Sequence, residues 1–101
     1  MNTTNQAINS ILEKSNGISK EEALAEFSLL IALSKRDKYK MECQKWGNKY
    51  QMSFEEFEKN LHAHKNQEDY EKESDLDDWE FAISSLKWWQ DRIEELIYVS
   101  N

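Results

Sequence analysis

The chain has 101 residues with no proline, two glycines, one cysteine and four tryptophans, and 20 acidic against 13 basic side chains give it a formal charge of −7. This length predicts a single domain, and one cysteine excludes an intramolecular disulfide framework and fits a reducing compartment. The sequence has no membrane-spanning apolar run, no signal-peptide pattern and no phosphate-binding loop. These features predict a soluble, cytoplasmic, all-helical protein.

Helical hydrophobic spacing begins in the N-terminal half, where the absence of proline permits long helices. Residues 1–17 are expected to form a short helix or an arm. Ser19 and Glu22 then have the spacing of a capping box, which predicts a long helix over residues 20–46. Gly47 with Asn48 is expected to break that helix. Its first apolar face comprises Leu24, Phe27, Leu30 and Ile31.

The C-terminal half repeats the same signals. Ser53 and Glu56 form a second capping box, which predicts a short helix over residues 54–65. Residues 66–75 are polar and acidic and are expected to form a linker. A second long helix is predicted over residues 76–98, with Ser74 or Asp75 as its N-cap.

The predicted fold class is therefore all-α. We expect a small helical bundle in which two long antiparallel helices form the scaffold, accompanied by a short N-terminal helix and a short middle helix. The last helix carries an apolar band wider than one packing partner covers, so either it is central in the bundle or part of it binds another chain. A twofold homodimer is one such expectation. The main stripe consists of Leu76, Trp79, Ile83, Leu86, Ile93 and Ile97, widened by Trp89 and Leu96.

Charge is distributed unevenly along the chain. Residues 35–49 have a formal charge of +4 and residues 50–80 a charge of −8. The basic stretch could contact phosphates of a nucleic acid, but it is expected instead to face the acidic segment of its own chain or an acidic protein surface, because the whole chain is acidic. The candidate anion-contacting residues are Lys35, Arg36, Lys38, Lys40, Lys45 and Lys49.

Acidic and aromatic residues near the last helix indicate a surface for a protein partner. Trp and Tyr are favoured at interfaces, and Trp88 lies beside Trp89, so the two point in different directions from one helix. A solvated acidic linker and an aromatic core are the alternative interpretations of the same residues. The candidate partner-binding residues are Tyr70, Asp75, Asp77, Asp78, Phe81, Trp88 and Val99.

The sequence offers no convincing catalytic, cofactor-binding or metal site. His62 and His64 are two residues apart and point to different faces of a helix, unlike a zinc-binding pair at i and i+4. Asp75, Asp77 and Asp78 resemble the start of a calcium loop but lack its glycine and its final glutamate. Cys43 lies on an apolar face, as a core residue does. We therefore expect a protein that is not an enzyme and uses no cofactor.

The run from Lys49 to Glu58 (KYQMSFEEFE), the acidic spacer and Asp78-Trp79 at the start of the last helix resemble a group of small acidic all-helical prokaryotic proteins. Many of these are antitoxin-like partners of a small toxin. The resemblance covers roughly residues 23–97, and Gly47-Asn48 departs from its pattern. It implies a non-catalytic protein that neutralises its partner by covering it.

Three functions follow as hypotheses. The first is an antitoxin-like module that binds a partner protein such as a small toxin. The second is a small structural or adaptor protein of phage origin that acts on another target through the same surfaces. The third is weak nucleic-acid binding through Lys35 to Lys49.

Overall fold

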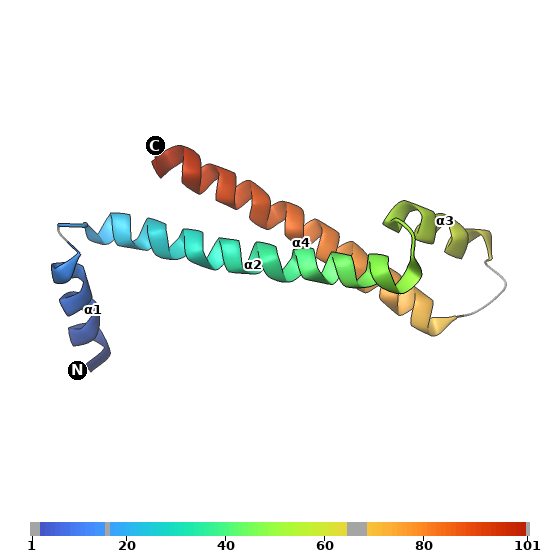
Figure 1. Cartoon of the computed structure of the whole chain (residues 1–101), viewed down its shortest axis with the longest axis horizontal. Coiled ribbons are helices and arrows are strands. Elements are labelled where there is room, and N and C mark those ends of the chain that lie inside the picture. Colours follow the sequence, from blue (N-terminus) through green and yellow to red (C-terminus); the bar gives the residue numbers. More distant parts are fainter. Residues whose placement is uncertain (1–2, 16, 65–68, 101) are drawn as a thin grey trace.

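The computed structural model describes residues 3–15, 17–64 and 69–100, without the side chains of residues 99 and 100. These residues form four helices and no strand, so the predicted all-α class is confirmed (Figure 1). The helices are α1 (Thr3–Lys14), α2 (Lys20–Tyr50), α3 (Phe54–Ala63) and α4 (Tyr70–Ser100).

Both predicted capping residues lie where the corresponding helices begin. The Ser19 hydroxyl accepts a hydrogen bond from the backbone N–H of Glu22 at 3.0 Å. The Ser53 hydroxyl accepts one from the N–H of Glu56 at 3.2 Å. Each bond satisfies an amide that has no partner within its own helix. The predicted starts of α2 and α3 are therefore confirmed.

The break predicted at Gly47 and Asn48 is wrong, because α2 continues through both residues to Tyr50. It ends at Gln51, which has φ 54° and ψ 40°, and the Gln51 N–H donates to the Gly47 carbonyl at 2.8 Å. A helix tolerates an interior glycine at a cost of about 1 kcal/mol. Here the extra turn brings Tyr50 onto the face that also carries Trp46.

The linker predicted over residues 66–75 is also largely wrong. Helix α4 begins at Tyr70, so its first turns comprise residues that were expected to be irregular. The N-cap is neither Ser74 nor Asp75, since the carboxylate of Asp69 accepts a hydrogen bond from the Lys72 N–H at 3.1 Å. Helix α3 ends at Ala63 rather than at residue 65, and residues 65–68 lie outside the described part of the chain.

Helices α2 and α4 pack against each other and run in opposite directions, and they diverge towards the start of α2 (Figure 1). The ring of Tyr39 lies 6.0 Å from that of Phe81, edge to face. The molecule measures 63 × 33 × 18 Å with a radius of gyration of 20.4 Å, whereas a compact chain of this length has about 13 Å. The bundle is therefore extended rather than compact.

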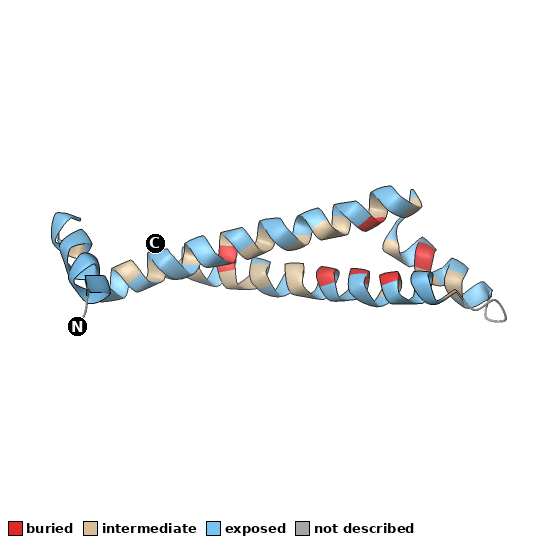
Figure 2. Ribbon diagram, turned by 90° about the horizontal axis from the view of Figure 1, so that it is seen from below, coloured by how far each residue is buried: buried red, intermediate tan, exposed pale blue. Residues whose placement is uncertain are grey.

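Helix α3 fills the space between the end of α2 and the start of α4, and the main core lies there (Figure 2). Trp46, Phe57 and Trp79, one from each of these helices, are buried together. The rings of Phe57 and Trp79 are 5.6 Å apart. Phe57 and Trp79 are buried, whereas Phe54 and Trp89 are only half-buried.

Away from α3 the contact between α2 and α4 is narrow. It rests mainly on Ala32, Ala82 and Ile93, all of which are buried. Two of these are alanines, whose short side chains allow helices to approach closely but bury little apolar area. No helix within the described residues is long and apolar enough to cross a membrane.

Candidate protein-binding surface

Four of the predicted partner-binding residues lie along one side of α4, which we call the outer face: Tyr70, Asp77, Phe81 and Trp88. A helix turns about 100° per residue, so these positions point within about 40° of one another. The aromatic members are exposed, with 73% of Tyr70, 62% of Phe81 and 50% of Trp88 accessible to solvent. Because α4 begins at Tyr70, all four are held on one rigid element.

Trp88 is half-exposed but held in place by its neighbours. Its ring meets that of Trp89 edge to face at 4.8 Å. The guanidinium of Arg92 lies 4.8 Å from the centre of the Trp88 ring and pairs with Glu95 at 2.9 Å. A large aromatic side chain that is ordered before binding loses little conformational entropy when a partner covers it.

The remaining predicted partner-binding residues do not share the outer face. Asp78 is exposed but is turned about 100° from Asp77, its neighbour on the helix. Asp75 is buried, with 7% of its surface accessible, and its carboxylate is bonded within the chain. The side chain of Val99 lies outside those described. Asp75 is thus part of the contact between helices rather than of the surface.

The carboxylate of Asp75 joins the end of α2 to α4. Lys49 Nζ lies 2.6 Å from Asp75 Oδ2 and 2.9 Å from Glu71 Oε1, and the Tyr50 hydroxyl donates to the same Asp75 oxygen. Burial raises the pKa of Asp75, but the hydrogen bonds from Lys49 and Tyr50 outweigh burial and leave the pKa below its usual value. We call Lys49, Tyr50 and Asp75 the clasp.

The other two groups of the clasp lose their protons at a higher pH than usual. Burial, followed by the hydrogen bond to Asp75, raises the pKa of Tyr50 to about 12. Hydrogen bonds to Asp75 and Glu71 raise the pKa of Lys49. At neutral pH the clasp therefore contains one ammonium, one neutral phenol and one carboxylate.

The six candidate anion-contacting residues do not form one uniform basic patch. Lys49 faces the acidic segment of its own chain, as the sequence predicted for the basic stretch. Arg36 pairs with its neighbour Asp37 at 3.0 Å. The ammonium groups of Lys38 and Lys45 lie over the rings of Tyr39 and Trp46 at 5.2 and 4.3 Å. Lys35 and Lys40 lie on different sides of α2, because five residues correspond to about 500° of turn.

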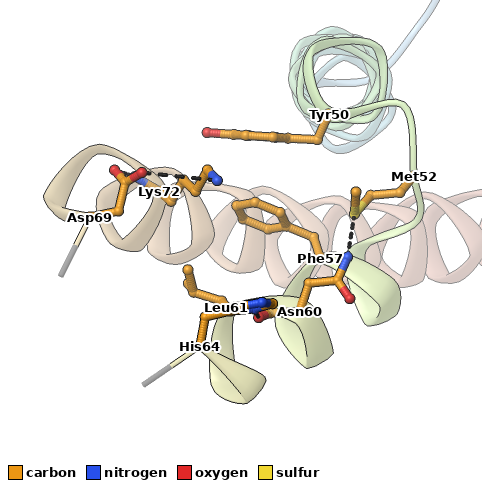
Figure 3. Close-up of a pocket in the computed structure, with 8 residues that line it drawn as sticks. All are labelled: Tyr50, Met52, Phe57, Asn60, Leu61, His64, Asp69 and Lys72. Carbon is orange, nitrogen blue, oxygen red and sulfur yellow. Dashed lines mark hydrogen bonds and ion pairs between the residues drawn. The ribbon is translucent and has the colours of Figure 1, made fainter. Parts of the chain in front are cut away.

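A pocket of about 510 Å³ opens beside the clasp, where α2, α3 and α4 meet (Figure 3). Its apolar wall includes Phe57 and Leu61, and its rim carries polar groups that bond to one another. His64 Nδ1 lies 2.7 Å from the backbone carbonyl oxygen of Asn60, and Lys72 Nζ lies 4.0 Å from Asp69 Oδ2. The lining consists of Tyr50, Met52, Phe57, Asn60, Leu61, His64, Asp69 and Lys72.

The described residues bring together no group of three or more His, Cys, Asp or Glu side chains that could hold a metal ion. Cys43 is half-buried against the Trp46 core, where the sequence placed it. Burial and the nearby charge of Glu42 raise the pKa of its thiol. A raised pKa lowers the fraction of thiolate, the form that attacks substrates.

Sequence reasoning missed how much apolar surface the start of α2 leaves exposed. Leu24 and Leu30 are each 65% exposed, and Phe27 is 62% exposed. The sequence showed that these residues share an apolar face but could not show what covers it. The lengths of the two long helices were the available signal. The antiparallel contact begins at Tyr50 and Asp75, so the start of α2 lies level with the end of α4.

Comparisons with protein families, with curated proteins and with solved structures give no match for this chain.

Proposed function

We propose that this protein is a non-catalytic binding module whose outer face of α4 captures a partner protein. The observation that carries the proposal is the alignment of Tyr70, Phe81 and Trp88, three exposed aromatic side chains on one continuous helix. A few residues dominate the binding energy at most interfaces, and Trp and Tyr are enriched among them. A helix that presents them at whole-turn spacing fits a groove on a partner.

Charge around the outer face indicates the kind of partner. Glu73, Asp77, Asp78 and Glu80 are exposed on the first half of α4, and none of them has an ion pair with another described residue. Carboxylates around an apolar centre speed the association with a basic surface and disfavour acidic partners. The proposed partner is therefore a basic protein with an apolar groove.

The specific form of this proposal is an antitoxin-like role in the cytoplasm. In it, the protein neutralises a small toxin by covering the toxin's surface, and no covalent chemistry is needed. Support comes from the resemblance of Lys49–Glu58 and Asp78-Trp79 to antitoxin-like proteins and from the exposed outer face. An adaptor role would use the same face on a different target.

Affinity capture from the native host, with quantitative mass spectrometry, tests the proposal. Wild-type protein should retain one basic protein, and Trp88→Ala together with Phe81→Ala should reduce its recovery at least tenfold. Tyr98→Ala is the matched control, because Tyr98 is 85% exposed on the same helix but turned about 80° from Trp88. Equal recovery with the double variant and the control would contradict the proposal.

A further inference from the structure

The first turns of α2 carry an apolar stripe that no helix of the described chain covers. We define the stripe as Leu24, Phe27, Leu30 and Ile31, which are 65%, 62%, 65% and 40% exposed. Surface this apolar is uncommon on a monomeric protein unless it meets another molecule. The stripe is separate from the outer face of α4, since α4 diverges from α2 at this end (Figure 1).

Helix α1 extends the same surface. It lies on the opposite side of α2 from the end of α4 (Figure 1), and none of its residues is buried. Between α1 and α2 runs a groove of about 680 Å³, whose apolar lining includes Ile8, Leu12, Leu24 and Phe27. The stripe and the groove together form one continuous apolar region.

Charges are ordered along α2 on either side of the stripe. Lys20, Glu21 and Glu22 precede it with a net charge of −1, and residues 35–38 (Lys, Arg, Asp, Lys) follow it with a net charge of +2, Arg36 being paired with Asp37. Two copies of α2 paired side by side in the same direction would bring like charges together. Two copies paired in opposite directions would place the acidic start of each beside the basic stretch of the other.

We propose that the stripe binds the stripe of a second copy of this chain, with the two α2 helices antiparallel about a twofold axis near Ser28. Glu21, Ser28 and Lys35 are spaced seven residues apart and lie on one flank of the stripe. In the antiparallel pair, Glu21 of each copy comes next to Lys35 of the other. A twofold axis closes the assembly at two chains, because the same patch is used by both.

The exposed area matches what such a dimer needs. These side chains are 40–65% exposed, and a side chain of this size exposed to that extent leaves roughly 100 Å² available. Six apolar side chains of α1 and α2 therefore offer roughly 600 Å² of accessible surface. With the polar residues around them, the area that each copy can bury approaches the ~800 Å² per partner of a standard interface. The six are Ile8, Ile11, Leu24, Phe27, Leu30 and Ile31.

Sedimentation equilibrium of the full chain tests the dimer. Wild-type protein should have twice the 12.1 kDa chain mass, and Phe27→Glu should be monomeric with unchanged helical circular dichroism, because Phe27 is 62% exposed. Met41→Glu is the control, since Met41 is an equally exposed side chain of α2 beyond the stripe. A monomeric wild type at every concentration, or a dimeric Phe27→Glu, would overturn the proposal.

A charge exchange tests the antiparallel arrangement. Glu21→Lys and Lys35→Glu should each weaken the dimer about tenfold at low salt, since each affects two exposed ion pairs. The two changes in one chain should restore wild-type affinity, because both pairs re-form with reversed sign. A double variant weaker than either single variant would show that the helices are not antiparallel. Binding of the partner at the outer face of α4 can be measured separately, with Phe27→Glu as the monomeric form.

Discussion

The ammonium of Lys49 lies 2.6 Å from the carboxylate of Asp75, 26 residues further along the chain. This contact, with the hydroxyl of Tyr50, ties the last turn of α2 to the beginning of α4. It fixes the register of the two long helices next to the Trp46 core. The clasp thus determines which side of α4 points outwards and presents Phe81 and Trp88.

Asp75→Asn should lower the free energy of unfolding by about 1–2 kcal/mol at neutral pH, because a part-buried charge-assisted hydrogen bond is replaced by weaker ones. The pKa of Asp75 is lowered in the folded state. Its contribution is therefore complete above the unfolded pKa of about 3.9 and lost as the pH falls below that value. Urea unfolding at neutral and acidic pH measures both effects.

The control for this experiment is Asp77→Asn, since Asp77 is exposed on the same helix. It should change the free energy of unfolding at neutral pH by less than about 0.5 kcal/mol. If the two variants are equally stable, the clasp does not hold the helices together.

Tyr50 should lose its proton at a higher pH than an unperturbed phenol. Its pKa is raised to about 12, so its neutral form is favoured by folding, and the stability this confers is lost as the pH rises from about 10 to about 12. Ultraviolet absorbance of the phenolate against pH should show a late phase in wild-type protein. In Tyr50→Phe that phase should be missing, and a persisting late phase would assign it to another residue.

Gly47→Ala should stabilise the protein by about 0.5–1 kcal/mol, because alanine favours a helix interior and its methyl group meets no atom within 4 Å at this position. Gly17→Ala should do the opposite, since Gly17 has φ +84°, which side-chain-bearing residues adopt at a cost. Thermal unfolding followed by circular dichroism compares the two. Destabilisation by Gly47→Ala would argue against a continuous α2.

Trp79 and Trp88 should respond differently to truncation. Trp79 is 4% exposed in the core, so Trp79→Ala should cost about 3–5 kcal/mol of unfolding free energy. Trp88 is 50% exposed, and Trp88→Ala should cost less than about 1 kcal/mol. Denaturant unfolding of both variants provides the measurement, and a large loss for Trp88→Ala would place Trp88 in the core.

Local signals predicted the starts of α2 and α3, but not that of α4. Ser19 and Ser53 cap α2 and α3 because capping depends on residues three positions apart. The last turn of α2 and the first turns of α4 were missed for the opposite reason. The Tyr50 hydroxyl bonds to Asp75, which favours the continuation of α2 past Gly47. Lys49 pairs with Glu71, which favours a helical start of α4. Contacts between residues this far apart in the sequence cannot be recognised from the local hydrophobic pattern.

The candidate surface was predicted in part. Exposure of Phe81 and Trp88 followed from helical spacing, since both lie off the main apolar stripe of α4. Their alignment with Tyr70 was not foreseen, because residues 66–75 were assigned to a linker. Asp75 was assigned to the surface because an acidic run in the sequence does not reveal that one of its members is buried and paired with Lys49.

Site-specific photo-crosslinking in the native host tests the central claim most directly. A photoreactive phenylalanine analogue at position 81 lies on the outer face of α4, and one at position 41 lies on α2, with native side chains there that are 62% and 68% exposed. We expect a single crosslinked protein from position 81 and none from position 41. No crosslink at position 81, or the same products from both positions, would contradict the proposal that the outer face of α4 binds the partner.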